Sequence, residues 1–404
     1  MRISAVLLLA LGALSAGCAD SALVDPPAGL TPLSATQRTV VETDNAFGLT
    51  LFQELAADNQ DNVFISPTSV SFALGMTANG AAGTTYDQMV TTLGKDGLSP
   101  QAVNESYRDL SAMLVGMDPE VRLQIANSIW YRQGYPVRSE FLETNRSYFH
   151  ADVEEADFGD PATPGRINGW VEDKTSGLID KVIDQIPGSV VMYLINAIYF
   201  KGTWLYEFDP QETTSQSFFN ADGTTSTVPL MAQQADLPYL VTDDYQAVDL
   251  PYGDSLFSMT VVLPSGDRTT GQVLAGLTSS EIAGWGEQFQ TEDVILMMPR
   301  FKVGYKESLK PTLAAMGMPE AFQGGRADFS RLVEGGGPWI DNVIHQAVID
   351  VNEEGTEAAA VTVVIIVESA GAGPKRVRLD RPFLLFIRER HTGSVLFMGR
   401  IAQL

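Results

Sequence analysis

Glu353-Glu354-Gly355-Thr356-Glu357-Ala358-Ala359-Ala360 runs directly into Val361-Thr362-Val363-Val364-Ile365-Ile366-Val367, about fifty residues before the C-terminus. Glycine tolerates backbone angles that are closed to other residues, so Gly355 can act as a pivot. The three alanines are slim enough to pass between strands, and the β-branched run fits a pleated, buried surface. The pattern indicates a strand that can enter a sheet. Its simpler alternative is an ordinary buried strand that ends in a surface turn.

The residues that follow this strand have a different character. Glu368-Ser369-Ala370-Gly371-Ala372-Gly373-Pro374 is small and turn-forming. Such a composition is typical of an exposed, protease-accessible loop. The sequence therefore predicts a flexible glycine (Gly355), then a strand (residues 356–367), and then an exposed loop (residues 368–374).

Short motifs extend over the chain from about residue 39 to its end. One is Ile195-Asn196-Ala197-Ile198-Tyr199-Phe200-Lys201-Gly202-Thr203-Trp204, and others lie at residues 62–70, 73–76, 80–85, 126–130, 167–171, 175–177, 298–302, 313–318, 327–330, 344–347, 381–387 and 396–400. In this order they resemble the serpin family. The stretch 353–376 resembles the hinge and reactive loop of the inhibitory members of that family.

The resemblance implies an α+β fold of about eight or nine helices around three β-sheets, with an exposed reactive loop. It also implies an irreversible suicide-substrate inhibitor of serine proteases, and no enzyme activity of its own. Cleavage of the loop would free its hinge side to enter the largest sheet as a new strand, while the protease stays covalently attached. The expected partner is a serine protease, with papain-like cysteine proteases as a second class.

Strand geometry tests whether the segment is fit for insertion. Successive side chains alternate faces, so the inward set would be Thr356, Ala358, Ala360, Thr362, Val364 and Ile366. None of these is charged, and residues 355–367 contain no proline, which would delete a ladder hydrogen bond. The composition favours inhibition over a non-inhibitory serpin that acts as a surface binding or adhesion module. A hydrolase is a more distant alternative.

The resemblance also suggests where the loop is cleaved. The bond would lie about fourteen residues beyond the hinge glycine, between Ser369 and Ala370. Glu368-Ser369 is the second choice and Val367-Glu368 the third. A small residue before the bond suits an elastase-like or subtilisin-like protease, whereas Glu368 would suit a glutamyl-specific one.

A basic cluster follows the loop, at Lys375, Arg376, Arg378 and Arg381. Cleavage after Arg376 by a trypsin-like protease would make the inserted arm far longer than the family's pattern. The favoured interpretation is a solvated strand edge, where positive side chains discourage edge-to-edge aggregation.

By the same resemblance, Ser66, Ser69, Asn196 and His345 match the shutter, a buried polar cluster beneath the strands that must part. Trp204 matches the tryptophan of the breach, where insertion begins, although plain core filling would also bury it. His345 as a general base is the rival interpretation, but no hydrolase signature surrounds Ser66, Ser69 or Ser330. No cofactor or metal is expected, because the histidines lack ligand spacing and no phosphate-binding loop follows a strand.

The N-terminus resembles that of a bacterial lipoprotein. Residues 1–17 carry a charged start, a short apolar run and small residues, as a secretory signal does. Cys18 follows directly and is the only cysteine, so no intrachain disulfide can form. Its setting resembles a lipobox, which implies lipidation of Cys18 and a place in the cell envelope, on the outer membrane. The alternative is an ordinary cleaved signal, with an extracellular protein.

The rest of the chain divides into a tether and one domain. Residues 18–38 are rich in Pro, Ala, Ser and Thr and predict a flexible tether, and residues 39–404 predict a single monomeric domain. A net charge of −24 argues against nucleic acid or an anionic membrane surface as a partner. Hydrophobic periodicity predicts helices at residues 41–58 and 172–182 and buried strands at 257–263 and 383–387.

Overall fold

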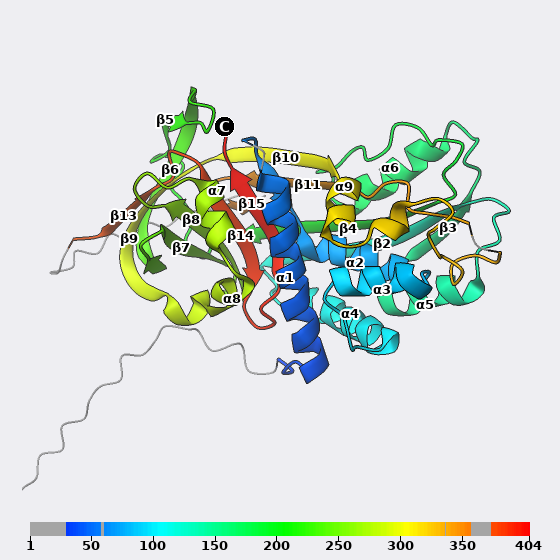
Figure 1. The fold of residues 1–404 in the computed structure, drawn as a ribbon. Helices are drawn as coiled ribbons and strands as arrows, with labels where there is room; N and C mark the ends of the chain where they lie inside the picture. The colour runs from blue at the N-terminus through cyan, green and yellow to red at the C-terminus, as the bar shows by residue number, and fades with distance from the viewer. Residues whose placement is uncertain (1–29, 58–59, 336, 357–372) are drawn as a thin grey trace, which may run out of the picture.

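The computed structural model describes residues 30–57, 60–335, 337–356 and 373–404. Its described helices are α1 (Ala35–Ala57), α2 (Pro67–Ala78), α3 (Gly83–Thr92), α4 (Pro100–Leu114), α5 (Ser139–Phe149), α6 (Thr163–Lys174), α7 (Thr270–Gly276), α8 (Ser279–Gln288), α9 (Lys310–Met316) and the 3₁₀ helix η1 (Pro319–Phe322). Figure 1 shows most of these helices gathered around two sheets that meet near the middle of the molecule. The expected α+β fold class is thereby confirmed.

One sheet has six strands, in the order β10-β11-β12-β4-β2-β3. They are β2 (Val121–Arg132), β3 (Asp152–Ala156), β4 (Met192–Thr203), β10 (Phe301–Ser308), β11 (Ile344–Val351) and β12 (Gly355–Thr356). The two-residue strand β12 is antiparallel to both of its neighbours. The long strands β4 and β11 therefore run parallel to each other, with β12 between them at one end.

The other sheet has nine strands, in the order β1-β15-β14-β8-β7-β6-β9-β13, and β5 pairs with β6 beside this path. They are β1 (Val63–Ile65), β5 (Thr214–Phe219), β6 (Thr225–Val241), β7 (Tyr245–Tyr252), β8 (Phe257–Pro264), β9 (Gln290–Pro299), β13 (Lys375–Arg378), β14 (Phe383–Glu389) and β15 (Val395–Ile401). Where three sheets were expected, two hydrogen-bonded sheets result, because the seventeen-residue β6 pairs with β5, β7 and β9.

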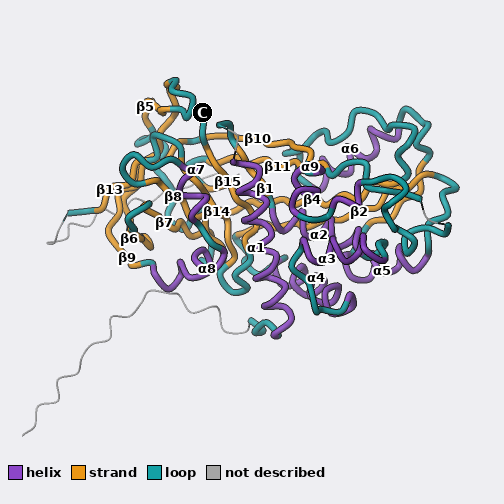
Figure 2. Tube along the Cα trace, viewed as in Figure 1, coloured by secondary structure: helices purple, strands orange, loops and turns teal. Residues whose placement is uncertain are grey.

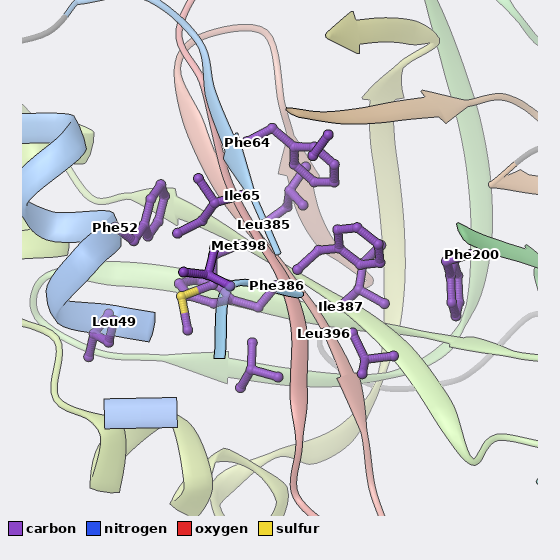
Figure 3. Packing of buried hydrophobic residues seen from close by; sticks show 14 of the residues in the cluster. Leu49, Phe52, Phe64, Ile65, Phe200, Leu385, Phe386, Ile387, Leu396 and Met398 are labelled. Atoms are coloured by element: carbon purple, nitrogen blue, oxygen red, sulfur yellow. The ribbon is translucent and has the colours of Figure 1, made fainter. Parts of the chain in front are cut away.

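The main core lies between the helices and the inner faces of both sheets. Phe52 of α1 packs edge-on against Phe386 of β14, and Phe64 of β1 stacks on Phe397 of β15. Figure 3 shows Phe52 of α1, Phe64 of β1, Phe386 of β14 and Met398 of β15 in this core. Figure 2 shows in the same view which segments are helices (purple) and which are strands (orange). Strands β8 and β14 confirm the two strands predicted from hydrophobicity.

A second, smaller core lies on the other face of the six-stranded sheet. It includes Trp130 of β2, Ile167 of α6, and Phe158 from the loop between β3 and α6. Because side chains alternate along a strand, Tyr193 and Ile195 of β4 join this cluster, while their neighbours in β4 join the main core. Helix α6 and helix α2 consequently cover opposite faces of the sheet.

Two helix boundaries differ from the expected ones. Helix α1 begins at Ala35, inside the segment expected as a tether, because Ser34 and Gln37 cap it reciprocally with backbone-to-side-chain hydrogen bonds of 2.8 and 3.2 Å. The predicted helix at 172–182 was wrong beyond Lys174, where α6 ends. Ser176 and Gly177 both adopt a positive φ, which interrupts the helix.

No helix among the described residues has the length and apolar character needed to cross a membrane.

Candidate functional site: the hinge and the opening in the six-stranded sheet

The hinge enters the six-stranded sheet at β12. Gly355 pairs with Thr203 and Thr356 with Gly202 on β4, and Thr356 also pairs with Val351 on β11. A Cβ atom on Gly355 would lie 2.1 Å from the carbonyl oxygen of Gly202. No residue with a side chain fits this close approach, so β12 forms in this register only with glycine at position 355.

Thr356 is buried in the sheet and held by a tyrosine. Its Oγ1 lies 2.7 Å from the hydroxyl of Tyr252, at the end of β7. Burial raises the pKa of Tyr252 well above its usual value, so this hydroxyl stays neutral. The ring of Tyr252 stacks on Trp204 with 4.3 Å between centroids, and the Trp204 indole donates to the carbonyl of Asn352 over 3.0 Å. Trp204 is thus a packing element of the hinge site.

The two glutamates before Gly355 are held by different contacts. The buried carboxylate of Glu353 accepts from Thr213 Oγ1 over 2.8 Å and lies 3.4 Å from Nη1 of the half-exposed Arg300. The carbonyls of Glu353 and Glu354 accept from the backbone N–H groups of Phe208 and Trp204, each over 2.8 Å. The segment 204–208 therefore clamps the backbone that leads into β12.

Beyond β12 the sheet is open between its long central strands. Within the described residues, β4 and β11 share no ladder, and a cavity of about 700 Å³ lies between them. Residues 192–197 of β4 and 344–346 of β11 line its two sides, and Ser69, Val70, Ala73, Leu74 and Thr77 of α2 line its inner wall. The opening continues the line of β12 down the sheet.

A buried polar cluster borders this opening on the α2 side. The backbone N–H of Ser66 donates to His345 Nε2 over 3.2 Å, and Ser66 Oγ accepts from the backbone N–H of Ser69 over 3.2 Å. Burial lowers the pKa of His345 to about 4. His345 is therefore neutral near pH 7 and accepts a hydrogen bond, and the Ser66 hydroxyl caps α2. This arrangement is structural and gives His345 no serine to activate.

Asn196 lies on the opposite side of the opening. Its amide donates to Asn127 Oδ1 over 2.8 Å, while its own Oδ1 is buried with no hydrogen-bond partner among the described residues. The structure thus brings Ser66, Ser69 and His345 together, and Asn196 lines the same cavity without bonding to them.

Several predicted site residues lie outside the described residues. They are the hinge residues 357–360, the inserting strand 361–367, the candidate scissile residues Glu368, Ser369 and Ala370, and the candidate lipidation residue Cys18. The basic cluster after the loop is described: β13 is the edge strand of its sheet, and Arg378 pairs with Asp380 over 2.7 Å. Across the described ranges, no group of three or more acidic, histidine or cysteine residues could hold a metal ion.

Three residues of the hinge site were not singled out from the sequence. Arg300 lies within the motif at residues 298–302. Tyr252 and Thr213 belong to none of the motifs, and a single sequence gives no indication that they contact the hinge. Tyr252 is 104 positions from its partner Thr356, and Thr213 is 140 positions from Glu353. Only an alignment that revealed correlated changes could have paired them in advance.

Comparison with known proteins gives consistent results. A sequence model of the family described as serpin (serine protease inhibitor) matches residues 42–404. Iripin-8 of Ixodes ricinus is 35% identical over 382 residues, which cover 91% of this chain and 94% of that protein. The native structure of the thermophilic serpin tengpin is similar with a TM-score of 0.83 and 32% identity, covering 93% of this chain and 96% of that one. Human thyroxine-binding globulin matches with a TM-score of 0.83 and 29% identity, over 91% and 99% of the two chains. The chain belongs to the serpin family, whose members are typically inhibitors of proteases and not catalysts.

Proposed function

We propose that this serpin is an irreversible suicide-substrate inhibitor of serine proteases that works by insertion of its cleaved loop into the six-stranded sheet. The observation that carries the proposal is the position of β12. Gly355 and Thr356 already occupy the end of a strand position between β11 and β4, and a cavity continues from them between the same two strands. The residues after Thr356 could therefore extend β12 into the space between β11 and β4.

The register of β12 supports insertion of the whole predicted strand. Continuing the antiparallel ladders would place Thr362 opposite Asn196 on β4 and opposite His345 on β11. The Thr362 hydroxyl would face inward, where Asn196 Oδ1 lacks a partner. Ile366 would reach Met192, the first residue of β4. The inserted segment thus matches the length of its neighbour.

The proposed reaction begins as ordinary proteolysis. The active-site serine oxygen of the protease attacks the carbonyl carbon of Ser369 and forms an ester. The bond to the nitrogen of Ala370 breaks, and that nitrogen leaves as an amine after taking a proton. Insertion of residues 357–367 then carries the ester-linked protease away from the site before water completes the hydrolysis.

We assign the target to elastase-like or subtilisin-like proteases, because Ser369 is small. Glu368 as the residue before the cleaved bond would change the target to a glutamyl-specific protease. Thyroxine-binding globulin, which its name describes as a binding protein, shares the fold. A non-inhibitory binding module is therefore the alternative that the test must separate.

The test uses the secreted chain carrying Cys18→Ser, incubated with pancreatic elastase, subtilisin, trypsin and a glutamyl endopeptidase. Denaturing gels and intact mass then follow each mixture. The expected result is an SDS-stable adduct with elastase or subtilisin and a released C-terminal peptide that begins at Ala370. Complete loop cleavage without an adduct, over a widened protease panel, would overturn the inhibitor and favour the binding module.

We also propose that Cys18 is lipidated and that the mature protein is tethered to the outer membrane of a bacterial envelope. The support is the signal-like segment that precedes Cys18 and the lipobox-like setting of that cysteine. Cell fractionation of the native chain and of Cys18→Ser tests this. Membrane association of the native chain alone is expected, and equal release of both chains would contradict it.

A further inference from the structure

Two carboxylates meet where the hinge is clamped. Glu207 belongs to the segment 204–208, and Glu354 directly precedes Gly355. The backbone hydrogen bonds from Trp204 and Phe208 to the hinge bring these two segments together, and Glu354 lies close enough for its charge to act on Glu207. Each carboxylate has one oxygen, Oε2, that is buried with no hydrogen-bond partner among the described residues.

The charged neighbours do not compensate this pair. Glu353 is bonded to Thr213 and to Arg300, so Arg300 is directed to Glu353. Asp209, on the clamping segment, accepts from the backbone of Gln211 over 2.8 Å. Tyr252, on the β7 side, is neutral and bonded to Thr356. Two acidic side chains, each with one buried and unbonded oxygen, therefore belong to the two segments that this contact joins.

Such an arrangement is unfavourable when both groups are ionised. Desolvation of a carboxylate and repulsion from a second carboxylate both favour the protonated form. A proton on one group removes the repulsion and supplies a donor for a hydrogen bond to the other. The strength of the clamp then depends on pH.

We propose that Glu207, beside Glu354, senses protons at the hinge: the docked hinge loosens when Glu207 is ionised and tightens when Glu207 takes up a proton. Burial, and next the charge of Glu354, raise the pKa of Glu207, which is the direction that this geometry requires. Acidification would therefore favour the state in which Thr356 lies in the sheet. The consequence for inhibition rests on the proposed function, but the pair itself does not.

The sign of the pH dependence follows from linkage. Because the pKa of Glu207 is higher in the folded state than its ordinary value, ionisation of Glu207 destabilises the folded protein. This destabilisation is present near neutral pH and disappears as the pH falls through the raised pKa. Removing one charge should therefore stabilise the protein near neutral pH and have no effect well below the ordinary pKa of glutamate.

Thermal unfolding of the full chain carrying Cys18→Ser tests this linkage. Relative to that chain, Glu207→Gln should raise Tm near neutral pH by about 1–3 °C and leave it unchanged near pH 3. Glu354→Gln should do the same, and the double variant should add nothing further, because one repulsion is removed only once. Glu287→Gln, on an exposed position of α8, is the matched control and should leave the Tm difference between the two pH values unchanged.

A local probe separates the hinge from global stability. The chain has five tryptophans, and 5-fluorotryptophan NMR with Trp204→Phe for assignment identifies the Trp204 signal. It should titrate with a midpoint above 4.5, the ordinary pKa of glutamate, and lose this titration in Glu207→Gln. An identical titration in that variant, or additive Tm effects, would overturn the pair. Neither the Tm nor the NMR measurement uses a protease. A negative result in them therefore does not contradict the inhibitor proposal, and a negative result in the protease assay does not contradict the role of Glu207.

Discussion

The hydroxyl of Tyr252 lies 2.7 Å from that of Thr356, and both side chains are buried. Tyr252 belongs to β7 of the nine-stranded sheet and Thr356 to β12 of the six-stranded sheet. This hydrogen bond therefore fastens the first inserted residue of the hinge to the other sheet. Stacking of Tyr252 on Trp204 fixes the ring that makes the bond. The uncleaved fold thus already holds the point from which the proposed insertion would start.

Tyr252→Phe should weaken this starting point. The variant leaves the Thr356 hydroxyl buried without its partner, which costs about 1–3 kcal/mol. We expect a lower Tm and, with a target protease, more inhibitor molecules cleaved for each protease trapped. Tyr239→Phe, whose hydroxyl lies 3.1 Å from Gln246 Oε1 away from the hinge, is the control. Equal trapping efficiency in Tyr252→Phe and the native chain would exclude a role for the hydrogen bond.

Thr356→Arg should convert the inhibitor into a substrate. Thr356 is buried in β12, so an arginine there would place an unpaired charge in the sheet. Insertion would slow, and the ester would be hydrolysed before the protease is trapped. Gel assays should show loop cleavage without an adduct. Thr356→Ser keeps the hydroxyl that bonds to Tyr252 and adds no charge, so it should retain most of the trapping. Undiminished inhibition by Thr356→Arg would refute the insertion mechanism.

Gly355→Ala should prevent β12 from forming in its present register. The added methyl group would meet the carbonyl oxygen of Gly202 at 2.1 Å, far inside contact distance. We expect faster amide hydrogen exchange at residues 350–356 and less efficient trapping. Gly373→Ala is the matched control, because a Cβ there meets nothing within 4 Å. Unchanged exchange in Gly355→Ala would show that the sheet accommodates the methyl group by moving.

For Gly355, the sequence predicted the position of the hinge but not the reason that glycine is required there. The sequence indicated a pivot at this position, from the backbone freedom of glycine. The structure supplies a different reason, since Gly355 is not among the glycines with positive φ and what matters is the close approach to Gly202. The position of the hinge could be predicted from residue types, but the steric reason needed the neighbouring strand.

The contacts around the hinge could not be predicted either, because the residues that meet there are far apart in the sequence. Arg300 and Glu353 are 53 positions apart, and Tyr252 and Thr356 are 104 apart. Hydrophobic periodicity identifies faces of single elements and says nothing about which distant side chains meet. The shutter shows the same limit: resemblance grouped Asn196 with His345, and the structure separates them by the opening between β4 and β11.

Acid should destabilise the native protein through His345. Burial lowers its pKa from 6.5 to about 4. A group with a depressed folded pKa contributes stability that is present above its unfolded pKa and lost as the pH falls through the folded one. Stability should thus fall between about pH 6.5 and pH 4, by on the order of 2–3 kcal/mol. Unfolding curves at several pH values measure this, and His345→Gln should flatten the dependence in that window. Parallel pH profiles would contradict the assignment.

Cleavage of the reactive loop should raise the thermal stability of the chain. The uncleaved sheet has an opening of about 700 Å³ between β4 and β11, and insertion would fill it with a central strand. Burial of Val364 and Ile366 alone contributes about 3–6 kcal/mol, which corresponds to several degrees in Tm. Calorimetry before and after limited digestion with thermolysin, a metalloprotease that forms no acyl-enzyme ester, measures the change. The same digestion of Thr356→Arg is the control, since cleavage there should leave Tm nearly unchanged. An equal Tm for the intact and cleaved native chains would mean that the opening stays unfilled, and insertion would then have to be abandoned as the mechanism.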